Sequence, residues 1–265
     1  MIVRSSVMAK EKRQMKKNLS RIVTIVCLGI FIYAAYGLVD IFLDYHQNQK
    51  MLSKVQETFY NASSAEEDTQ NENGQSDTIR PGFKELLKQN ADVVGWITID
   101  GTQIDYPILQ ASNNETYLTQ NYNGSDSRAG SVFLDYRNDI DSPGLNTVVY
   151  GHRMKDGSMF QHLTKFLDKD FFESHRTFEF DTLYDSYEAE IFAVYNTLTD
   201  FDYIKTDFAN EEEYEQLLLD IQQQSKFQTD IEVSADDSII TLSTCDYELD
   251  ENEGRLVVQA KLVKK

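Results

Sequence analysis

The sequence predicts a mainly β domain, a mixed β-barrel with peripheral helices, that follows an N-terminal transmembrane helix. Three observations lead to this fold class. An apolar run near the N-terminus is long enough to cross a membrane, and residues 81–265 contain many short stretches rich in β-branched and aromatic residues. Amphipathic helical patterns lie between these stretches but are fewer, which is typical of a barrel with helices on its outside.

The first element is the expected membrane anchor at residues 22–43. This stretch is apolar apart from Thr24 and Asp40, and a membrane span needs about 20 apolar residues. Seven Lys and Arg residues lie in the tail 1–21. We therefore expect a single-pass protein of the cell membrane, with a cytoplasmic tail and an extracellular domain. A cleaved signal peptide is the rival interpretation, but residues 44–47 do not resemble a cleavage site.

Residues 44–80 are expected to form a juxtamembrane helix and a flexible stalk. Met51, Leu52, Val55 and Phe59 recur at helix-like spacing. The residues from 61 to 78 are almost all polar, a composition typical of a flexible linker. The folded domain is therefore expected to occupy residues 81–265.

Within the domain, the length and alternation of the apolar runs define the remaining elements. Strands are expected at 94–99, 103–109, 131–135, 147–150, 177–180, 187–195, 239–245 and 255–263. Helices are expected at 81–90, 158–167, 169–175 and 210–224, with a helical turn at 115–120. Ser158 is the expected N-cap of the second of these helices.

The charge of the chain is unevenly distributed. The net charge is −19, although the first 43 residues hold seven basic residues against two acidic ones, so the rest of the chain is strongly acidic. An acidic surface repels phosphates, and no nucleic acid is expected as a partner.

The two cysteines are informative because of where they lie. Cys27 is inside the expected span, so Cys245 is the only thiol of the outward part and no intrachain disulfide can form there. An unpaired thiol outside the cell is exposed to oxidation, which favours a functional role for it. A small, buried structural cysteine is the alternative interpretation.

The residues around Cys245 suggest thiol chemistry. Cys245 ends one expected strand and Arg255 begins the next. In an antiparallel pair they would meet at one rim, where a guanidinium favours thiolate and can hold an oxyanion. His152 follows a strand and Gly151, which places it to exchange a proton with the thiol. The other histidines have simpler explanations, in the stalk (His46), on a helix (His162) and at a helix end (His175).

These segments resemble the sortases, and class B sortases most closely. The resemblance is carried by residues 150–160, which begin Tyr-Gly-His, by Thr-Leu-Ser-Thr-Cys at 241–245 and by Gly-Arg-Leu-Val-Val at 254–258. Residues 105–108 and 130–138 look like the same class, and the similarity extends over residues 81–263. The strand ending in Cys is moderately specific alone, but with the histidine upstream and the arginine downstream the combination is strong.

The resemblance implies an eight-stranded sortase β-barrel and a cysteine transpeptidase. Cys245 would attack the Thr carbonyl of a C-terminal sorting signal, NPQTN-like or PxTG-like, on a secreted protein. His152 would protonate the leaving amine, and Arg255 would hold the substrate and the oxyanion. The thioacyl enzyme would then pass the protein to an amine of a peptidoglycan precursor or cross-bridge.

The same resemblance implies a substrate groove without a metal. Class B members lack the calcium-binding loop of class A, and no metal and no cofactor are expected here. The acids Asp246 and Glu248 show no liganding pattern and are expected to be solvated, with their role in the site left open. The expected substrate-binding residues are Asn114, Leu118, Tyr150, Tyr203, Ile204, Ser243 and Thr244.

Three alternatives remain open. A pilin-polymerising sortase would join pilin subunits, although the sequence before residue 81 has no lid segment of the class C type. A thiol protease would use water as the acceptor. A non-catalytic adhesion or sensor domain on the same barrel would function without Cys245.

Overall fold

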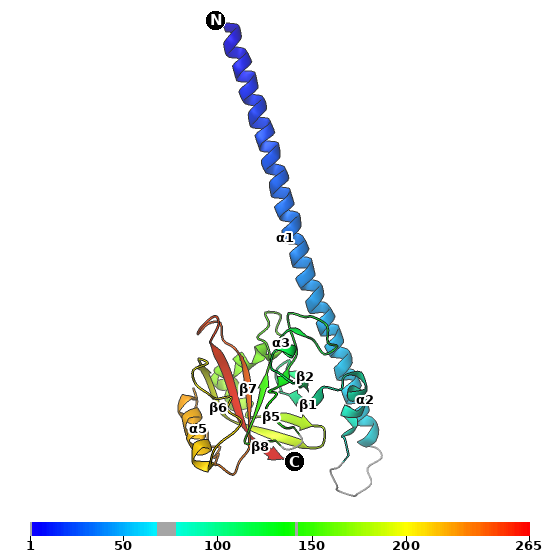
Figure 1. The fold of residues 1–265 in the computed structure, drawn as a ribbon, viewed down its shortest axis with the longest axis vertical. Coiled ribbons are helices and arrows are strands. Elements are labelled where there is room, and N and C mark those ends of the chain that lie inside the picture. The colour runs from blue at the N-terminus through cyan, green and yellow to red at the C-terminus, as the bar shows by residue number, and fades with distance from the viewer. Residues whose placement is uncertain (1, 68–77, 141–142) are drawn as a thin grey trace. The chain divides into compact units, whose positions relative to one another are not determined.

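The computed structural model describes residues 2–67, 78–140 and 143–265. The chain divides into two compact units, residues 1–47 and 48–265. The first unit is the N-terminal part of helix α1 (Ile2–Glu67), blue in Figure 1. The second unit holds the end of that helix and all of the β-structure.

Helix α1 contains the candidate membrane anchor. Its stretch Gln14–Ser64 is the one helix among the described residues that is long and apolar enough to cross a membrane. The large apolar side chains between Ile22 and Leu43 are exposed. Apolar side chains without protein partners are stable in an apolar surrounding, so length, composition and exposure agree with a membrane span.

The second unit is built on a closed barrel of eight β-strands, which confirms the expected fold class (Figure 1). Around the barrel the strands run in the order β1, β2, β3, β4, β7, β8, β6, β5. Their bounds are Val93–Thr98 (β1), Asp105–Leu109 (β2), Phe133–Leu134 (β3), Asn146–Tyr150 (β4), Thr177–Thr182 (β5), Ser186–Thr197 (β6), Ile239–Cys245 (β7) and Arg255–Lys264 (β8). Every expected strand is present, within a few residues of its expected bounds.

Two pairings determine which strand ends meet. Strand β4 pairs in parallel with β7, with Tyr150 opposite Ser243. Strand β7 pairs antiparallel with β8, with Cys245 opposite Arg255. The C-terminal ends of β4 and β7 and the N-terminal end of β8 therefore lie at the same rim of the barrel.

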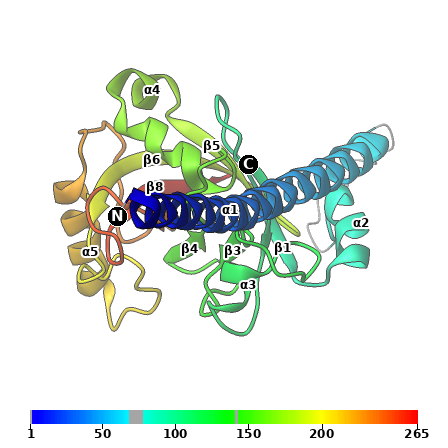
Figure 2. The same cartoon turned by 90° about the horizontal axis from the view of Figure 1, so that it is seen from above.

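Helices lie around the periphery of the barrel (Figure 2). Their bounds are Pro81–Gln89 (α2), Thr116–Thr119 (α3), Phe160–Leu167 (the 3₁₀ helix η1), Lys169–Ser174 (α4) and Glu211–Gln224 (α5). Helix α5 begins with a side-chain cap, because Asn210 Oδ1 accepts from the Glu213 amide at 2.9 Å. It packs against the barrel through Tyr214, Leu217, Leu218 and Ile221.

The prediction that Ser158 is the N-cap of the second amphipathic helix is wrong. Met159, at a left-handed φ of 52°, holds the N-cap position of η1 and makes no side-chain capping bond. The Ser158 hydroxyl donates instead to Asp156 Oδ1 at 2.6 Å. The left-handed residue between Ser158 and the helix separates the serine from the first turn.

The end of α1 packs against the barrel. Phe59 stacks on Trp96 of β1, with ring centroids 4.1 Å apart, and is 6% exposed. The Tyr60 hydroxyl donates to Asp105 Oδ1 at 2.7 Å, an atom that also accepts from the Trp96 indole at 2.7 Å. These contacts place one apolar face of α1 in the same core cluster as α2 and β1.

The domain boundary consequently differs from the expected one at residue 81. The compact unit begins at Asn48, because the apolar face of residues 48–59 finds partners on the barrel. The segment expected as a flexible stalk is helical as far as Glu67. The remainder of that expected stalk, residues 68–77, lies outside the described residues.

Candidate active site

A pocket with a volume of about 270 Å³ opens at the rim where β4, β7 and β8 meet. It contains polar, apolar and titratable side chains from five separate parts of the chain. Its lining residues are Asn114, Leu118, Phe133, Tyr150, Gly151, His152, Ser243, Thr244, Cys245 and Arg255. The three expected catalytic residues are therefore brought together at one pocket.

Cys245 reaches the pocket because β7 is a buried central strand. Ile239, Ile240 and Leu242 are fully buried, which fixes the register of β7 between β4 and β8. The last residue of β7 is Cys245, which is partly exposed. The buried part of β7 therefore holds Cys245 rigidly, while the thiol at the end of the strand remains accessible to a substrate.

His152 is positioned by the turn after β4. The Gly151 amide donates to the Ser243 carbonyl at 3.2 Å, which continues the β4–β7 pairing by one residue. A Cβ at position 151 would lie 2.7 Å from the Phe160 ring, so only glycine fits there. His152 Nε2 lies 2.7 Å from the Leu118 carbonyl oxygen.

The electrostatics of the pair favour a thiolate and an imidazolium. A hydrogen bond with His152 lowers the pKa of the Cys245 thiol; burial opposes this, and the Arg255 charge and a Tyr247 hydrogen bond support it. The hydrogen bond with Cys245 raises the pKa of His152, against the effect of burial and with the help of the Leu118 carbonyl. A thiolate is the nucleophilic form of cysteine, and an imidazolium can donate a proton.

Arg255 is held by the loop that precedes it. Its Nη1 donates to the carbonyl oxygens of Asn252, at 3.0 Å, and of Gly254, at 2.8 Å. The residue lines the pocket and faces Cys245 across the β7–β8 ladder. A guanidinium fixed in this way can stabilise negative charge beside the sulfur without first having to reorganise.

The expectation that both acids after Cys245 are solvated is wrong for Asp246. Asp246 is 5% exposed and accepts from Arg153 Nη1 at 3.1 Å and from Asn196 Nδ2 at 2.5 Å. Glu248 also contacts Arg153, at 3.0 Å, but its side chain is 83% exposed. Burial of Asp246 is possible because strand β6 and the turn after β4 supply donors that are distant in the sequence.

Five of the expected substrate-binding residues line the pocket, namely Asn114, Leu118, Tyr150, Ser243 and Thr244. The other two lie elsewhere. Tyr203 is buried, with its hydroxyl 2.8 Å from Ser243 Oγ. The Ile204 carbonyl accepts from Arg137 at 2.9 Å.

Sequence reasoning missed several residues around the pocket. Phe133 lines it, and Tyr247 contributes to lowering the pKa of the Cys245 thiol. Asp135 and Arg137 lie behind the pocket wall. Phe133, Asp135 and Arg137 belong to a segment that resembles sortases, but nothing in their local pattern indicated which side chains face inward. Among the residues that the structure describes, no group of His, Cys, Asp and Glu is arranged to hold a metal ion.

Comparison with known proteins gives a consistent result. The sortase domain family matches residues 97–263. Sortase B of Listeria monocytogenes is 44% identical over 252 residues, which cover 95% of this chain and 100% of the relative. Sortase B from Bacillus anthracis in complex with AAEK1 has a similar structure, with a TM-score of 0.74 and 50% identity over 85% of this chain and 100% of that chain.

The Staphylococcus aureus sortase B–substrate complex is also similar, with a TM-score of 0.76 and 36% identity over 84% of this chain and 99% of that chain. The match therefore extends over nearly all of each relative and includes the strands that carry the pocket. The chain belongs to the sortase family, in its class B, and is a cysteine transpeptidase.

Proposed function

We propose that this sortase cleaves a C-terminal sorting signal after its Thr and transfers the secreted protein to an amine of the cell wall. The observation that carries the proposal is the meeting of Cys245, His152 and Arg255 at one pocket. A nucleophile, a proton donor and an oxyanion holder are the parts that acyl transfer needs.

The first half of the reaction forms a thioester. The Cys245 thiolate attacks the Thr carbonyl carbon, and the carbonyl electrons move to the oxygen, where Arg255 stabilises the negative charge. When the tetrahedral intermediate collapses, the peptide C–N bond breaks. His152 donates its proton to the departing amine, which leaves as a neutral group.

The second half releases the enzyme. An acceptor amine attacks the thioester carbonyl, and neutral His152 accepts the proton that the amine loses. The C–S bond breaks, and Cys245 leaves as a thiolate. The proposed acceptor is the amine of a peptidoglycan precursor or cross-bridge.

The proposed location matches this chemistry. Residues 22–43 anchor the chain in the cell membrane, the basic tail stays in the cytoplasm, and the barrel acts outside. The apolar stretch within Gln14–Ser64 and the seven basic residues before it support this topology. Secreted substrates and wall precursors are accessible on that side of the membrane.

The chemistry of the pocket supports a peptide with mixed character. Leu118 and Phe133 offer apolar contacts, whereas Asn114, Tyr150 and Ser243 offer hydrogen-bonding groups. An NPQTN-like or PxTG-like signal combines a Pro with polar neighbours and Thr. The relative from Staphylococcus aureus has been described in a substrate complex.

The test is a peptide panel that varies the residues around Pro and Thr, read by mass spectrometry. The full chain in detergent should form a Cys245 adduct with the preferred signal, and an added amine should convert the adduct into a ligated product. Cys245→Ala should form no adduct. Arg255→Lys should be severely impaired, because a point charge cannot replace a planar fork.

Four results would contradict the proposal or part of it. Hydrolysis alone, even at saturating amine, would indicate a thiol protease. Ligation to a pilin Lys in preference to wall-derived amines would indicate pilus assembly. Absence of any adduct across the panel would favour a non-catalytic domain, and wild-type rates for Arg255→Lys would remove Arg255 from the mechanism.

A further inference from the structure

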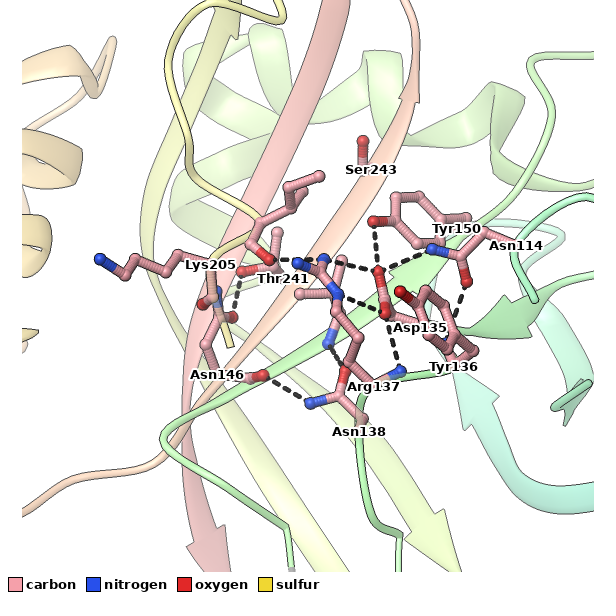
Figure 3. Close-up of polar contacts among 12 residues, drawn as sticks. Asn114, Asp135, Tyr136, Arg137, Asn138, Asn146, Tyr150, Lys205, Thr241 and Ser243 are labelled. Carbon is pink, nitrogen blue, oxygen red and sulfur yellow. Dashed lines mark hydrogen bonds and ion pairs between the residues drawn. The ribbon is translucent and has the colours of Figure 1, made fainter. Parts of the chain in front are cut away.

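A buried carboxylate, that of Asp135, contacts two of the residues that line the pocket (Figure 3). Asp135 is 0% exposed. It accepts two hydrogen bonds from the Arg137 fork, both at 2.8 Å. It also accepts from the Tyr150 hydroxyl at 2.8 Å and from Asn114 Nδ2 at 2.9 Å. One carboxylate thus holds two residues that line the pocket.

The bonds to Asp135 also fix the orientation of the Asn114 amide. Its Nδ2 faces a carboxylate, which only accepts, and its Oδ1 accepts from the Tyr136 amide at 3.0 Å. Exchanging the nitrogen and the oxygen would break both bonds. The Asn114 amide group therefore has one fixed orientation at the pocket, with its nitrogen and its oxygen in defined positions.

Arg137 connects this carboxylate to a distant turn. Its Nη2 donates to the Ile204 carbonyl at 2.9 Å. Asn146 Nδ2 donates to the two neighbouring carbonyls, of Tyr203 at 3.0 Å and of Lys205 at 2.9 Å. Two side chains, those of Arg137 and Asn146, which Figure 3 labels, thus hold three successive carbonyls of the turn at 203–205.

The same turn supports the floor of the pocket. The Tyr203 hydroxyl lies 2.8 Å from the hydroxyl of Ser243, which lines the pocket two residues before Cys245. Displacement of the turn would therefore change the environment of Ser243. The Asp135–Arg137 pair is thereby linked to three pocket-lining residues, none of which is adjacent to another in the sequence.

The pair is suited to act as a rigid support. Burial alone would raise the pKa of Asp135, but hydrogen bonds from Arg137, Tyr150 and Asn114 outweigh burial and lower it. The carboxylate therefore remains charged, and releasing any donor would leave a buried charge with less compensation. A planar, bidentate guanidinium also permits only one arrangement of its partners.

We propose that Asp135 and Arg137 are positioning residues. They hold Asn114, Tyr150 and the 203–205 turn in fixed positions and so determine how tightly the pocket binds the sorting signal. This inference rests on the proposed function of the pocket. Neither residue takes part in bond making. The pair acts through the residues that contact the peptide.

Arg137→Lys tests the proposal. Lysine keeps the positive charge beside Asp135 but cannot bind both carboxylate oxygens and the Ile204 carbonyl at once. With the preferred peptide, KM should rise about tenfold, the effect of losing one charge-assisted hydrogen bond. The kcat value should stay within about twofold of wild type. The rate of Cys245 alkylation should do so too, because iodoacetamide reacts with the thiol without occupying the peptide-binding pocket.

Arg176→Lys is the matched control. Arg176 makes one ion pair, with Asp230 at 3.0 Å, and its side chain is 29% exposed, close to the 32% of Arg137. It does not line the pocket. The control should leave KM unchanged, so a general effect of replacing an arginine can be recognised.

Amide hydrogen exchange supplies a readout that needs no substrate. Exchange in residues 198–210 should be faster in Arg137→Lys than in wild type or in Arg176→Lys. An unchanged KM in a folded Arg137→Lys protein would overturn the proposal, and so would a parallel fall in alkylation rate. If the wild type accepts no peptide while exchange changes as expected, the proposed function fails, and the role of the pair in signal binding fails with it. The positioning of the 203–205 turn by Arg137 would still be supported. If the wild type reacts with the peptides as expected but exchange in Arg137→Lys is unchanged, the proposed function stands, and the positioning of the 203–205 turn by Arg137 is refuted.

Discussion

Phe59→Ala tests whether the end of α1 belongs to the folded unit. Phe59 is 6% exposed, stacks on Trp96 at 4.1 Å and meets Phe83 edge-on at 5.2 Å. Truncation of a buried Phe to Ala costs about 3–5 kcal/mol. Each aromatic pair contributes about 0.5–1.5 kcal/mol to that loss. We expect a decrease near 3 kcal/mol, at the lower end of the ~3–5 kcal/mol range, because a helix at the edge of the unit can partly readjust.

The assay uses the single tryptophan of the chain, Trp96, whose ring is covered by Phe59. Urea unfolding of the full chain in a non-ionic detergent can be followed by its fluorescence. With a slope of about 3 kcal/mol per M, a loss of about 3 kcal/mol lowers the unfolding midpoint by about 1 M. The emission of the native variant should also shift to the red, because water gains access to the indole.

Phe42→Ala is the control on the same helix. Phe42 lies in the expected span and is 69% exposed, so its truncation should change the unfolding free energy by less than about 0.5 kcal/mol. The reasoning would be refuted if Phe59→Ala lost less than about 1 kcal/mol and left the emission of Trp96 unchanged. Helix α1 would then not be docked on β1 in solution.

Two further predictions concern the rim of the barrel. The rate of Cys245 alkylation should reach half its maximum below pH 9.0, the ordinary pKa of the thiol, because the hydrogen bond with His152 lowers that pKa and keeps thiolate present at lower pH. His152→Ala should move the midpoint upward, and an unchanged midpoint would exclude His152 from thiolate formation. Gly254→Ala should abolish peptide turnover and lower the thermal unfolding midpoint, because a Cβ there would lie 2.1 Å from the Asp246 carbonyl oxygen. Gly144→Ala, where a Cβ meets nothing within 4 Å, should change neither quantity, and equal behaviour of the two variants would contradict the packing argument.

Local patterns in the sequence predicted much of the fold. The alternation of apolar residues located all eight strands, and the short apolar runs of β4 and β7 were recognisable because both strands are buried. The prediction was less accurate where one residue of unusual conformation decides the structure. Met159 is such a case, since its positive φ displaced the expected cap at Ser158.

Part of the site was also predictable from local patterns in the sequence. Cys245 and Arg255 lie on adjacent antiparallel strands, so their sequence separation alone places them at one rim. His152 required the parallel pairing of β4 with β7, which joins segments about 90 residues apart. The sequence analysis did not predict that pairing: it placed His152 at a strand end, and the family resemblance implied only that His152 and Cys245 act together.

Local sequence patterns were therefore sufficient to locate the apolar segment long enough to cross a membrane, the eight strands, and the Cys, His and Arg residues that meet at the pocket. Three features depend on contacts between distant segments: the compact unit begins at Asn48, Asp246 is buried, and Asp135, through Arg137, connects the pocket to the 203–205 turn. Sequence periodicity indicates only which face of a helix or strand is apolar. The partner of that face, and the donors available to a buried charge, come from distant parts of the chain.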